Sequence, residues 1–131
     1  MKINAQLIRN AQEALVASKI VDSNGKYKKE FGGYISSLGA AIVQSGLLPA
    51  MIFYESDSEQ ASERKKVVKA LAYILNKDKE QYNINGSIAS FLLDNMDNAS
   101  FDKNLFLKKV TEAATAMKLA LRMNEKGGKD E

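Results

Sequence analysis

Apolar residues recur at helical spacing along most of the chain. They fall every three or four positions from residue 3 to residue 21, and the same spacing resumes after the turn-forming segment Asp22-Ser23-Asn24-Gly25. Gly46 suits the end of this second helix, and Pro49 suits the first turn of a short apolar helix over residues 48–55. The first part of the chain is therefore predicted to hold three helices.

The second part of the chain repeats this pattern with longer polar connectors. A fourth helix is expected from a cap at Asp57 or Ser58 to about Asn76, a short fifth helix over residues 87–95, and a last helix from Ser100 or Asp102 to about residue 124. We expect an all-α fold with no sheet: a compact bundle of five to six helices, with residues 1–124 as a single helical domain and residues 125–131 as a flexible C-terminal tail. The predicted core residues are Phe31, Leu38, Ile42, Phe53, Leu71, Leu75, Phe106 and Val110.

Missing residue types limit the chemistry. The chain has no cysteine and no histidine, which excludes disulfides, thiolate nucleophiles and the usual histidine bases and metal ligands. The densest carboxylate group, Asp94, Asp97 and Asp102, does not follow the calcium-loop pattern, so we interpret it as a solvated, cap-rich connector. The expectation is a protein that binds and does not catalyse, with no metal or other cofactor. A carboxylate–metal enzyme remains the alternative, if these aspartates converge.

The N-terminal residues begin an amphipathic helix and do not resemble a secretion signal. No stretch approaches the roughly 18 apolar residues that a membrane-spanning helix needs. These features favour a cytoplasmic location.

Charge is unevenly distributed along the chain, whose formal net charge is +3 and whose pI is near 9.0. Residues 58–77 are rich in lysine and arginine, whereas residues 78–102 carry five acidic residues against Lys79. Lys65, Lys66 and Lys69 are expected on the face of the fourth helix opposite its apolar stripe, where they could track phosphates. An ordinary solvated helix face is the alternative.

Other cations lie at the start of the second helix and near the end of the last. Lys26, Lys28 and Lys29 are expected to crowd the first turn of the second helix, where the helix dipole disfavours positive charge, so they could form an anion site or an idle surface cluster. Lys118 and Arg122 lie one turn apart. The candidate phosphate-binding residues are Lys26, Lys28, Lys29, Arg64, Lys65, Lys66, Lys69, Lys118 and Arg122.

One stretch has the pattern of a known family. Glu30-Phe31-Gly32-Gly33-Tyr34 opens a helix that runs to Ile42-Val43-Gln44-Ser45-Gly46-Leu47, and a short apolar helix then ends in Phe53-Tyr54. The last helix carries Thr111-Glu112-Ala113-Ala114 followed by basic residues. This order resembles the small helical subunit of the type III-B CRISPR (Cmr) RNA-targeting complex. The chain departs from that family where Met117 and Leu121 occupy a region in which family members often carry aromatic residues.

The resemblance implies a non-catalytic subunit of a ribonucleoprotein complex in antiviral defence. Several copies would stack beside the backbone subunits and contribute a sequence-independent basic RNA-binding surface, made of the cations named above, to the channel for guide RNA and target RNA. The implied partners are the backbone and large subunits of the Cmr complex, copies of the chain itself and both RNAs, with no membrane. The alternatives are the small subunit of a type III-A complex and a helical adaptor or DNA-binding regulator, although no recognition turn and base-reading helix is evident.

Overall fold

The computed structural model describes residues 3–56 and 61–127. In these residues the all-α prediction is confirmed, because the structure is 68% helical. The elements in chain order are α1 (Ala5–Ala17), β1 (Lys26–Tyr27), α2 (Lys29–Ser45), α3 (Leu47–Glu55), α4 (Ala61–Leu75), α5 (Ile88–Asn95), α6 (Lys103–Arg122) and β2 (Glu125–Lys126).

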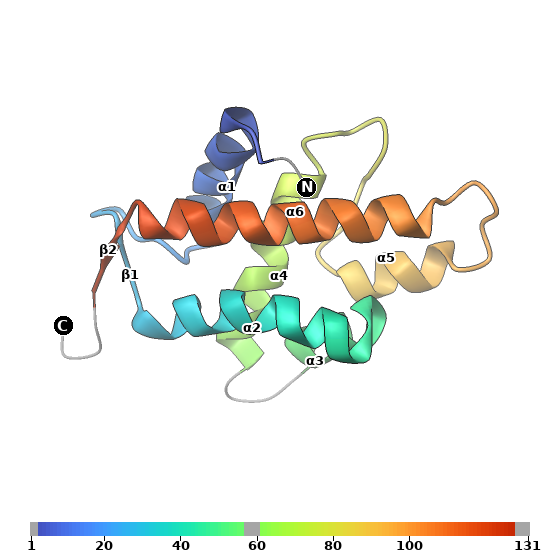
Figure 1. Ribbon diagram of the computed structural model, residues 1–131, viewed down its shortest axis with the longest axis horizontal. Coiled ribbons are helices and arrows are strands. Elements are labelled where there is room, and N and C mark those ends of the chain that lie inside the picture. Colours follow the sequence, from blue (N-terminus) through green and yellow to red (C-terminus); the bar gives the residue numbers. More distant parts are fainter. Residues whose placement is uncertain (1–2, 57–60, 128–131) are drawn as a thin grey trace.

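The long helix α6 organises the bundle (Figure 1). It runs along the longest dimension of the molecule with α2 beside it in the opposite direction, and α4 crosses behind both. Helix α1 packs against α6 and α4 near one end of the molecule, while α5 contacts α3 near the other end. The connector between α5 and α6, with its aspartates, therefore lies far from β1 and β2.

Polar side chains cap three of the helices at their N-termini. Asn4 Oδ1 accepts a hydrogen bond from the Leu7 amide at 2.8 Å in α1, and Ser87 Oγ accepts one from the Ser90 amide at 3.0 Å in α5. Asp102 caps α6 in the same way, which confirms one of the two predicted caps of that helix. The caps predicted for α4 at Asp57 or Ser58 lie outside the described residues.

The core lies between α1, α2, α4 and α6, and it contains seven of the eight predicted core residues: Phe31, Leu38, Ile42, Leu71, Leu75, Phe106 and Val110. The eighth prediction, Phe53, is wrong, because 57% of this residue is exposed. Helix α3 is apolar around its whole circumference, so helical spacing alone does not distinguish its buried face. That face is formed by Ala50, Met51 and Tyr54.

Helix α1 ends at Ala17, four residues before the predicted end at Val21. Lys19 takes the left-handed conformation that closes a helix, with φ of 66°. Its amide donates to the Val16 carbonyl at 3.0 Å, and the Ile20 amide donates to the Leu15 carbonyl at 2.9 Å. The chain turns away at this point, so Ile20 is buried by the turn and not by a continuing helix.

A short parallel pairing joins the start of α2 to the end of α6, a feature that helical spacing did not predict. Lys26 in β1 is opposite Glu125 in β2, and the Gly127 amide donates to the Tyr27 carbonyl at 2.8 Å. Residues 125–127 thus lie against β1. The flexible tail predicted for residues 125–131 stays a prediction, because residues 128–131 lie outside the described part of the chain.

Candidate nucleic-acid interface

The start of α2 presents three lysines in succession. Lys26 belongs to β1, Lys28 occupies the N-cap position with an extended backbone, and Lys29 is the first helical residue. The side chain of Lys28 makes no capping hydrogen bond, and Glu30 supplies an acidic group in the first turn. Only one of the three lysines therefore lies inside the helix, and the expectation that all three crowd its first turn is wrong. The strand pairing places Lys26 and Lys28 just ahead of the helix.

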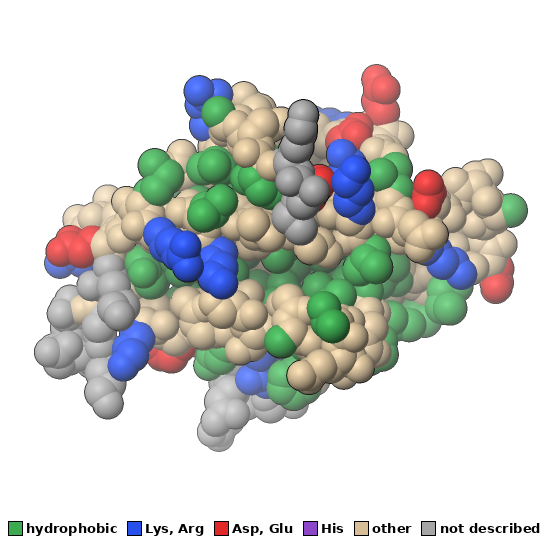
Figure 2. All heavy atoms as spheres, viewed as in Figure 1, with side chains coloured by type: hydrophobic (Ala, Val, Ile, Leu, Met, Phe, Trp, Pro, Cys, Tyr) green, Lys and Arg blue, Asp and Glu red, His purple; other side chains and the backbone are tan. Residues whose placement is uncertain are grey.

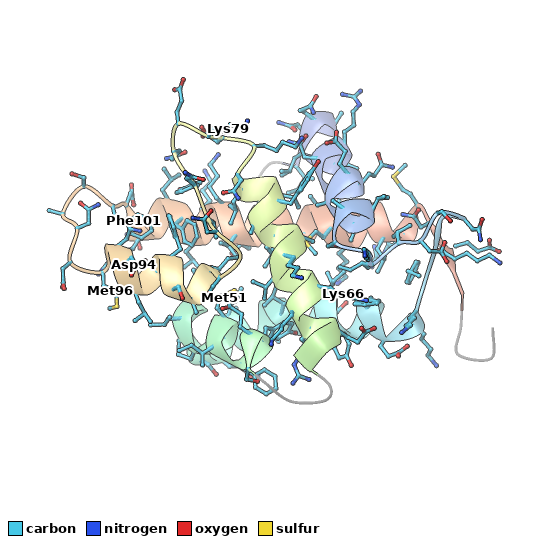
Figure 3. All side chains as sticks on the ribbon, turned by 180° about the vertical axis from the view of Figure 1, so that it is seen from behind. Met51, Lys66, Lys79, Asp94, Met96 and Phe101 are labelled. Carbon is cyan, nitrogen blue, oxygen red and sulfur yellow. The ribbon has the colours of Figure 1, made fainter. Side chains whose placement is uncertain are left out.

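Lys26 and Lys28 join Lys19 and Lys66 around a hollow of about 370 Å³. We call it the lysine hollow; its remaining lining residues are Ile20, Asp22, Tyr27, Phe31 and Gly127. The four lysines come from the turn after α1, from β1 and the start of α2, and from α4, where Figure 3 labels Lys66. Sequence reasoning missed Lys19, since it placed this residue inside the first helix.

Glu63 of α4 orients two of the hollow's lysines. Its carboxylate oxygens lie 3.3 Å from Lys28 Nζ and 3.3 Å from Lys66 Nζ. Burial acts to raise the pKa of Glu63, but hydrogen bonds from Lys66 and Lys28 outweigh it, so the pKa lies below its ordinary value. Lys66 Nζ also lies 5.8 Å from the centre of the Phe31 ring. Four lysines meet two carboxylates here, Glu63 and Asp22, and the cluster keeps a positive charge.

The remaining cations of α4 lie on or beside its narrow polar face. Lys69 is exposed and Lys65 is half-buried, as expected for residues opposite an apolar stripe. The half-buried Arg64 has its guanidinium 4.6 Å from the centre of the exposed Phe53 ring. Tyr73 does not stand free beside the lysines, because its hydroxyl donates to Glu13 Oε1 of α1 at 3.2 Å. Helix α4 therefore adds cations next to the lysine hollow.

Lys118 and Arg122 lie apart from this group, on α6. Both are exposed, and Lys118 lines a separate groove of about 160 Å³ between α2 and α6. Figure 2 shows two lysine or arginine side chains next to each other on this side of the molecule and others scattered around it, whereas Lys66 is seen from behind, in Figure 3. The structure thus divides the predicted basic residues between two faces.

The acidic connector does not form a metal site in the described structure. Asp94 and Asp97 are exposed, and Asp102 serves as the cap of α6. Over residues 3–56 and 61–127, no three carboxylates come together in a way that could hold a metal ion. None of the helices in this same part of the chain has the length and apolar character to span a membrane.

The family model of the CRISPR-associated protein (Cas_Cmr5) matches residues 8–123. The chain belongs to this family. Members of the Cas_Cmr5 family are the small subunit of the type III-B Cmr complex. Membership therefore decides against the type III-A alternative. It also implies association with other subunits of the Cmr complex. Comparisons with curated proteins and with solved structures gave no match.

Proposed function

We propose that this chain is a non-catalytic small subunit that stacks in several copies along the guide RNA and target RNA channel of a type III-B Cmr ribonucleoprotein complex. In this role it serves antiviral defence in the cytoplasm and contributes a basic, sequence-independent contact to RNA. The lysine hollow is the observation that carries the proposal. Lys19, Lys26, Lys28 and Lys66 converge there from separate segments of the chain.

The chemistry of this surface favours phosphates over bases. Lysine acts as a flexible point charge, which neutralises phosphate without reading sequence. Lys69 and Lys65 of α4 extend the positive surface beyond the hollow, and Lys29 extends it along the start of α2. Binding at such a surface releases counterions, so affinity should depend strongly on salt and weakly on base sequence.

The two basic faces have different expected roles. RNA that follows the lysine hollow and α4 leaves Lys118 and Arg122 on the other side of α6. We assign the main RNA contact to the hollow, because four lysines meet there around one depression. Lys118 and Arg122 are then available to a second segment of RNA or to a neighbouring subunit.

The experiment compares two triple variants in the reconstituted complex. The first changes Lys19, Lys26 and Lys28 to glutamine, and the control changes the exposed Lys79, Lys103 and Lys108 to glutamine. Both variants lose three positive charges, so any loss of long-range electrostatic attraction for RNA should be the same in both. The measurement is target-RNA affinity against salt concentration.

The hollow variant should bind more weakly, and its salt slope should flatten by about 0.7 for each single-strand phosphate that the variant no longer neutralises. The control should keep the wild-type slope. Equal slopes in the wild type and both variants would contradict RNA binding at the lysine hollow and leave a role in protein packing.

A further inference from the structure

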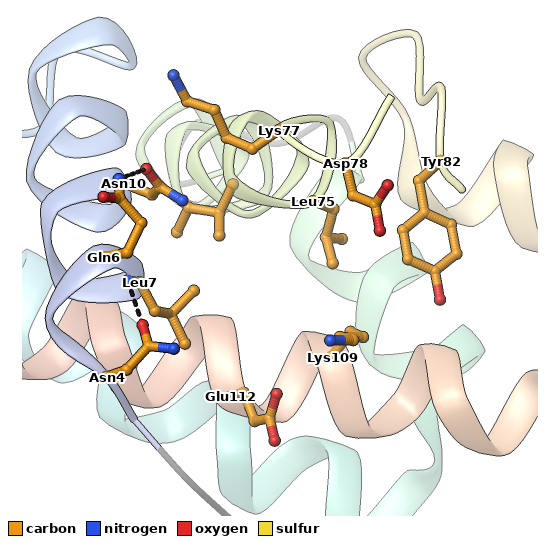
Figure 4. Close-up of a pocket in the computed structure, with 11 residues that line it drawn as sticks. Asn4, Gln6, Leu7, Asn10, Leu75, Lys77, Asp78, Tyr82, Lys109 and Glu112 are labelled. Carbon is orange, nitrogen blue, oxygen red and sulfur yellow. Dashed lines mark hydrogen bonds between the residues drawn. The ribbon is translucent and has the colours of Figure 1, made fainter. Parts of the chain in front are cut away.

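A second polar hollow lies between α1, the end of α4 and α6 (Figure 4), and its volume is about 270 Å³. We call it the Glu112 pocket. The lining residues that matter here are Leu75, Lys77, Asp78, Tyr82, Lys109 and Glu112. Only 9% of Glu112 is exposed, and within the described chain its carboxylate makes no hydrogen bond or ion pair.

The Glu112 side chain is mostly buried, but its carboxylate oxygens keep some contact with solvent, and no donor in the described residues binds them. Proteins usually pair such a group with a cation or a hydrogen-bond donor. Glu112 instead faces a hollow with space for a further group. The missing partner is therefore expected to come from outside the described residues.

The charges around the pocket favour a cationic partner. Asp78 lines the pocket with Glu112 and supplies a second carboxylate. Lys77 is already engaged, because its Nζ lies 2.8 Å from Glu13 and 4.9 Å from the centre of the Tyr73 ring. Lys109 lies one turn before Glu112 and is exposed, and the two do not form an ion pair in the structure. Asp78 and Glu112 thus face only Lys109 as a lysine that no other carboxylate binds, so the pocket carries a net negative charge.

The size and lining of the pocket favour a guanidinium group over a bare metal ion. No three carboxylates converge as metal ligands in the described residues. A planar guanidinium can pair with one carboxylate through two N–H groups and direct its others toward a second acceptor. Leu75 and the buried ring of Tyr82 supply apolar walls for the methylene groups of an arginine side chain.

We propose that the Glu112 pocket receives an arginine side chain from a neighbouring protein subunit, with Glu112 as the paired carboxylate. This inference rests on the chain acting as a subunit of the larger complex. Asp78 and the Tyr82 hydroxyl provide further acceptors at the pocket. Lys109, being exposed, turns to solvent when the arginine enters.

The first test uses the full-length chain in solution and amide-detected NMR. N-acetyl-arginine amide is the probe, and N-acetyl-citrulline amide is its neutral control of the same shape. The arginine probe should shift the amide signals of Leu7, Leu75 and Tyr82 in a saturable way, and the citrulline probe should not. Glu112→Gln should weaken binding at least tenfold, whereas Glu80→Gln, an equal charge change at an exposed position outside the pocket, should not.

Several results of this first test would overturn the proposal: no saturable shifts, equal shifts with citrulline, or unchanged binding in Glu112→Gln. Tighter binding of spermidine than of the arginine probe would assign the pocket to free polyamines. Thermal unfolding adds a separate readout, because Glu112→Gln should keep or raise the melting temperature of the isolated chain. If Glu112→Gln and Lys109→Met both lower it, Glu112 pairs with Lys109 and the proposal is wrong.

The second test places Glu112→Gln in the reconstituted complex. Its incorporation should fall at least tenfold in competition with the wild-type chain, while incorporated copies keep the wild-type salt slope for target RNA. The lysine-hollow variant should show the reverse pattern, so failure of one proposal is distinguishable from failure of the other. Incorporation equal to wild type would overturn the assignment to a partner's arginine.

Discussion

The lysine hollow and the Glu112 pocket both lie against α4, but their charges are organised differently. At the hollow, the chain supplies its own counter-ion, because Glu63 lies 3.3 Å from both Lys28 Nζ and Lys66 Nζ. At the pocket, Glu112 is buried without any such partner in the described chain. The cations of the hollow are thus positioned by a carboxylate of the same chain, whereas the carboxylate of the pocket has no partner among the described residues, which is why we propose one from outside.

This difference predicts how each region responds to a partner. Glu63 already holds Lys28 and Lys66 in the free chain, so the proposed RNA binding should cost little reorganisation of these two side chains. The pocket gains its main electrostatic stabilisation only when a cation enters. The side chains of the hollow should therefore keep the same conformation in the free and bound protein. The structure around the pocket should become more stable on binding.

The largest expected effect comes from weakening the helix that supports both regions. Leu71 of α4 has no exposed surface, so Leu71→Ala should lower the free energy of unfolding by about 2 to 5 kcal/mol. Urea denaturation measures the change. A loss below about 0.5 kcal/mol would show that α4 is not the shared support of the two regions.

A smaller loss of stability is expected from a substitution that loosens only the Glu112 pocket. Asn76 binds the backbone of Ile84 twice: its Oδ1 accepts from the Ile84 amide at 2.7 Å, and its Nδ2 donates to the Ile84 carbonyl at 2.8 Å. These bonds fold the loop that carries Asp78 and Tyr82, so Asn76→Ala should cost about 1 to 3 kcal/mol. Hydrogen exchange should quicken at Ile84 and Tyr82 but not around the hollow.

Asn83→Ala is the matched control for this loop, since Asn83 is exposed. It should leave both the stability and the exchange rates near those of the wild type. Faster exchange at Lys28 and Phe31 in the Asn76 variant, to the same degree as at Ile84, would show that the two regions do not open independently.

The smallest expected change in stability concerns Glu63 at the hollow, and it depends on pH. The folded-state pKa of Glu63 is lowered, since hydrogen bonds from Lys66 and Lys28 outweigh burial. Its stabilisation is therefore present above the unfolded pKa of about 4.3 and is lost as pH falls through the folded value. Glu63→Gln should cost no more than about 1 kcal/mol at pH 7 and less at pH 3. A melting-temperature gap between wild type and variant that stays constant over this range would contradict the account.

Helical spacing predicted most of the fold, because six of the elements are amphipathic or strongly apolar runs between polar turns. It failed at Phe53, where α3 is apolar all round, and at the end of α1, where a lysine takes a conformation more typical of glycine. It also missed β1 and β2, since two-residue strands carry no periodic pattern.

The two sites differ in how much of them the sequence could predict. Runs of lysine marked Lys26, Lys28 and Lys66 as candidates, but their meeting with Lys19 depends on the turn after α1 and on α4 crossing behind α2. Glu112 stood out only as part of a family pattern. The pocket that it lines is completed by α1 and by the loop after α4, which come from distant parts of the chain.

The parallel pairing of β1 with β2 also affects how the protein can be handled. It places Gly127 at the lysine hollow, while Asn4, near the other end of the described chain, lines the Glu112 pocket. Replacing or extending the described ends of the chain, at Asn4 or Gly127, would therefore alter the lining of one of the two proposed binding regions. The exposed loop at residues 97–100, at the far end of the molecule, is the better insertion point for a label.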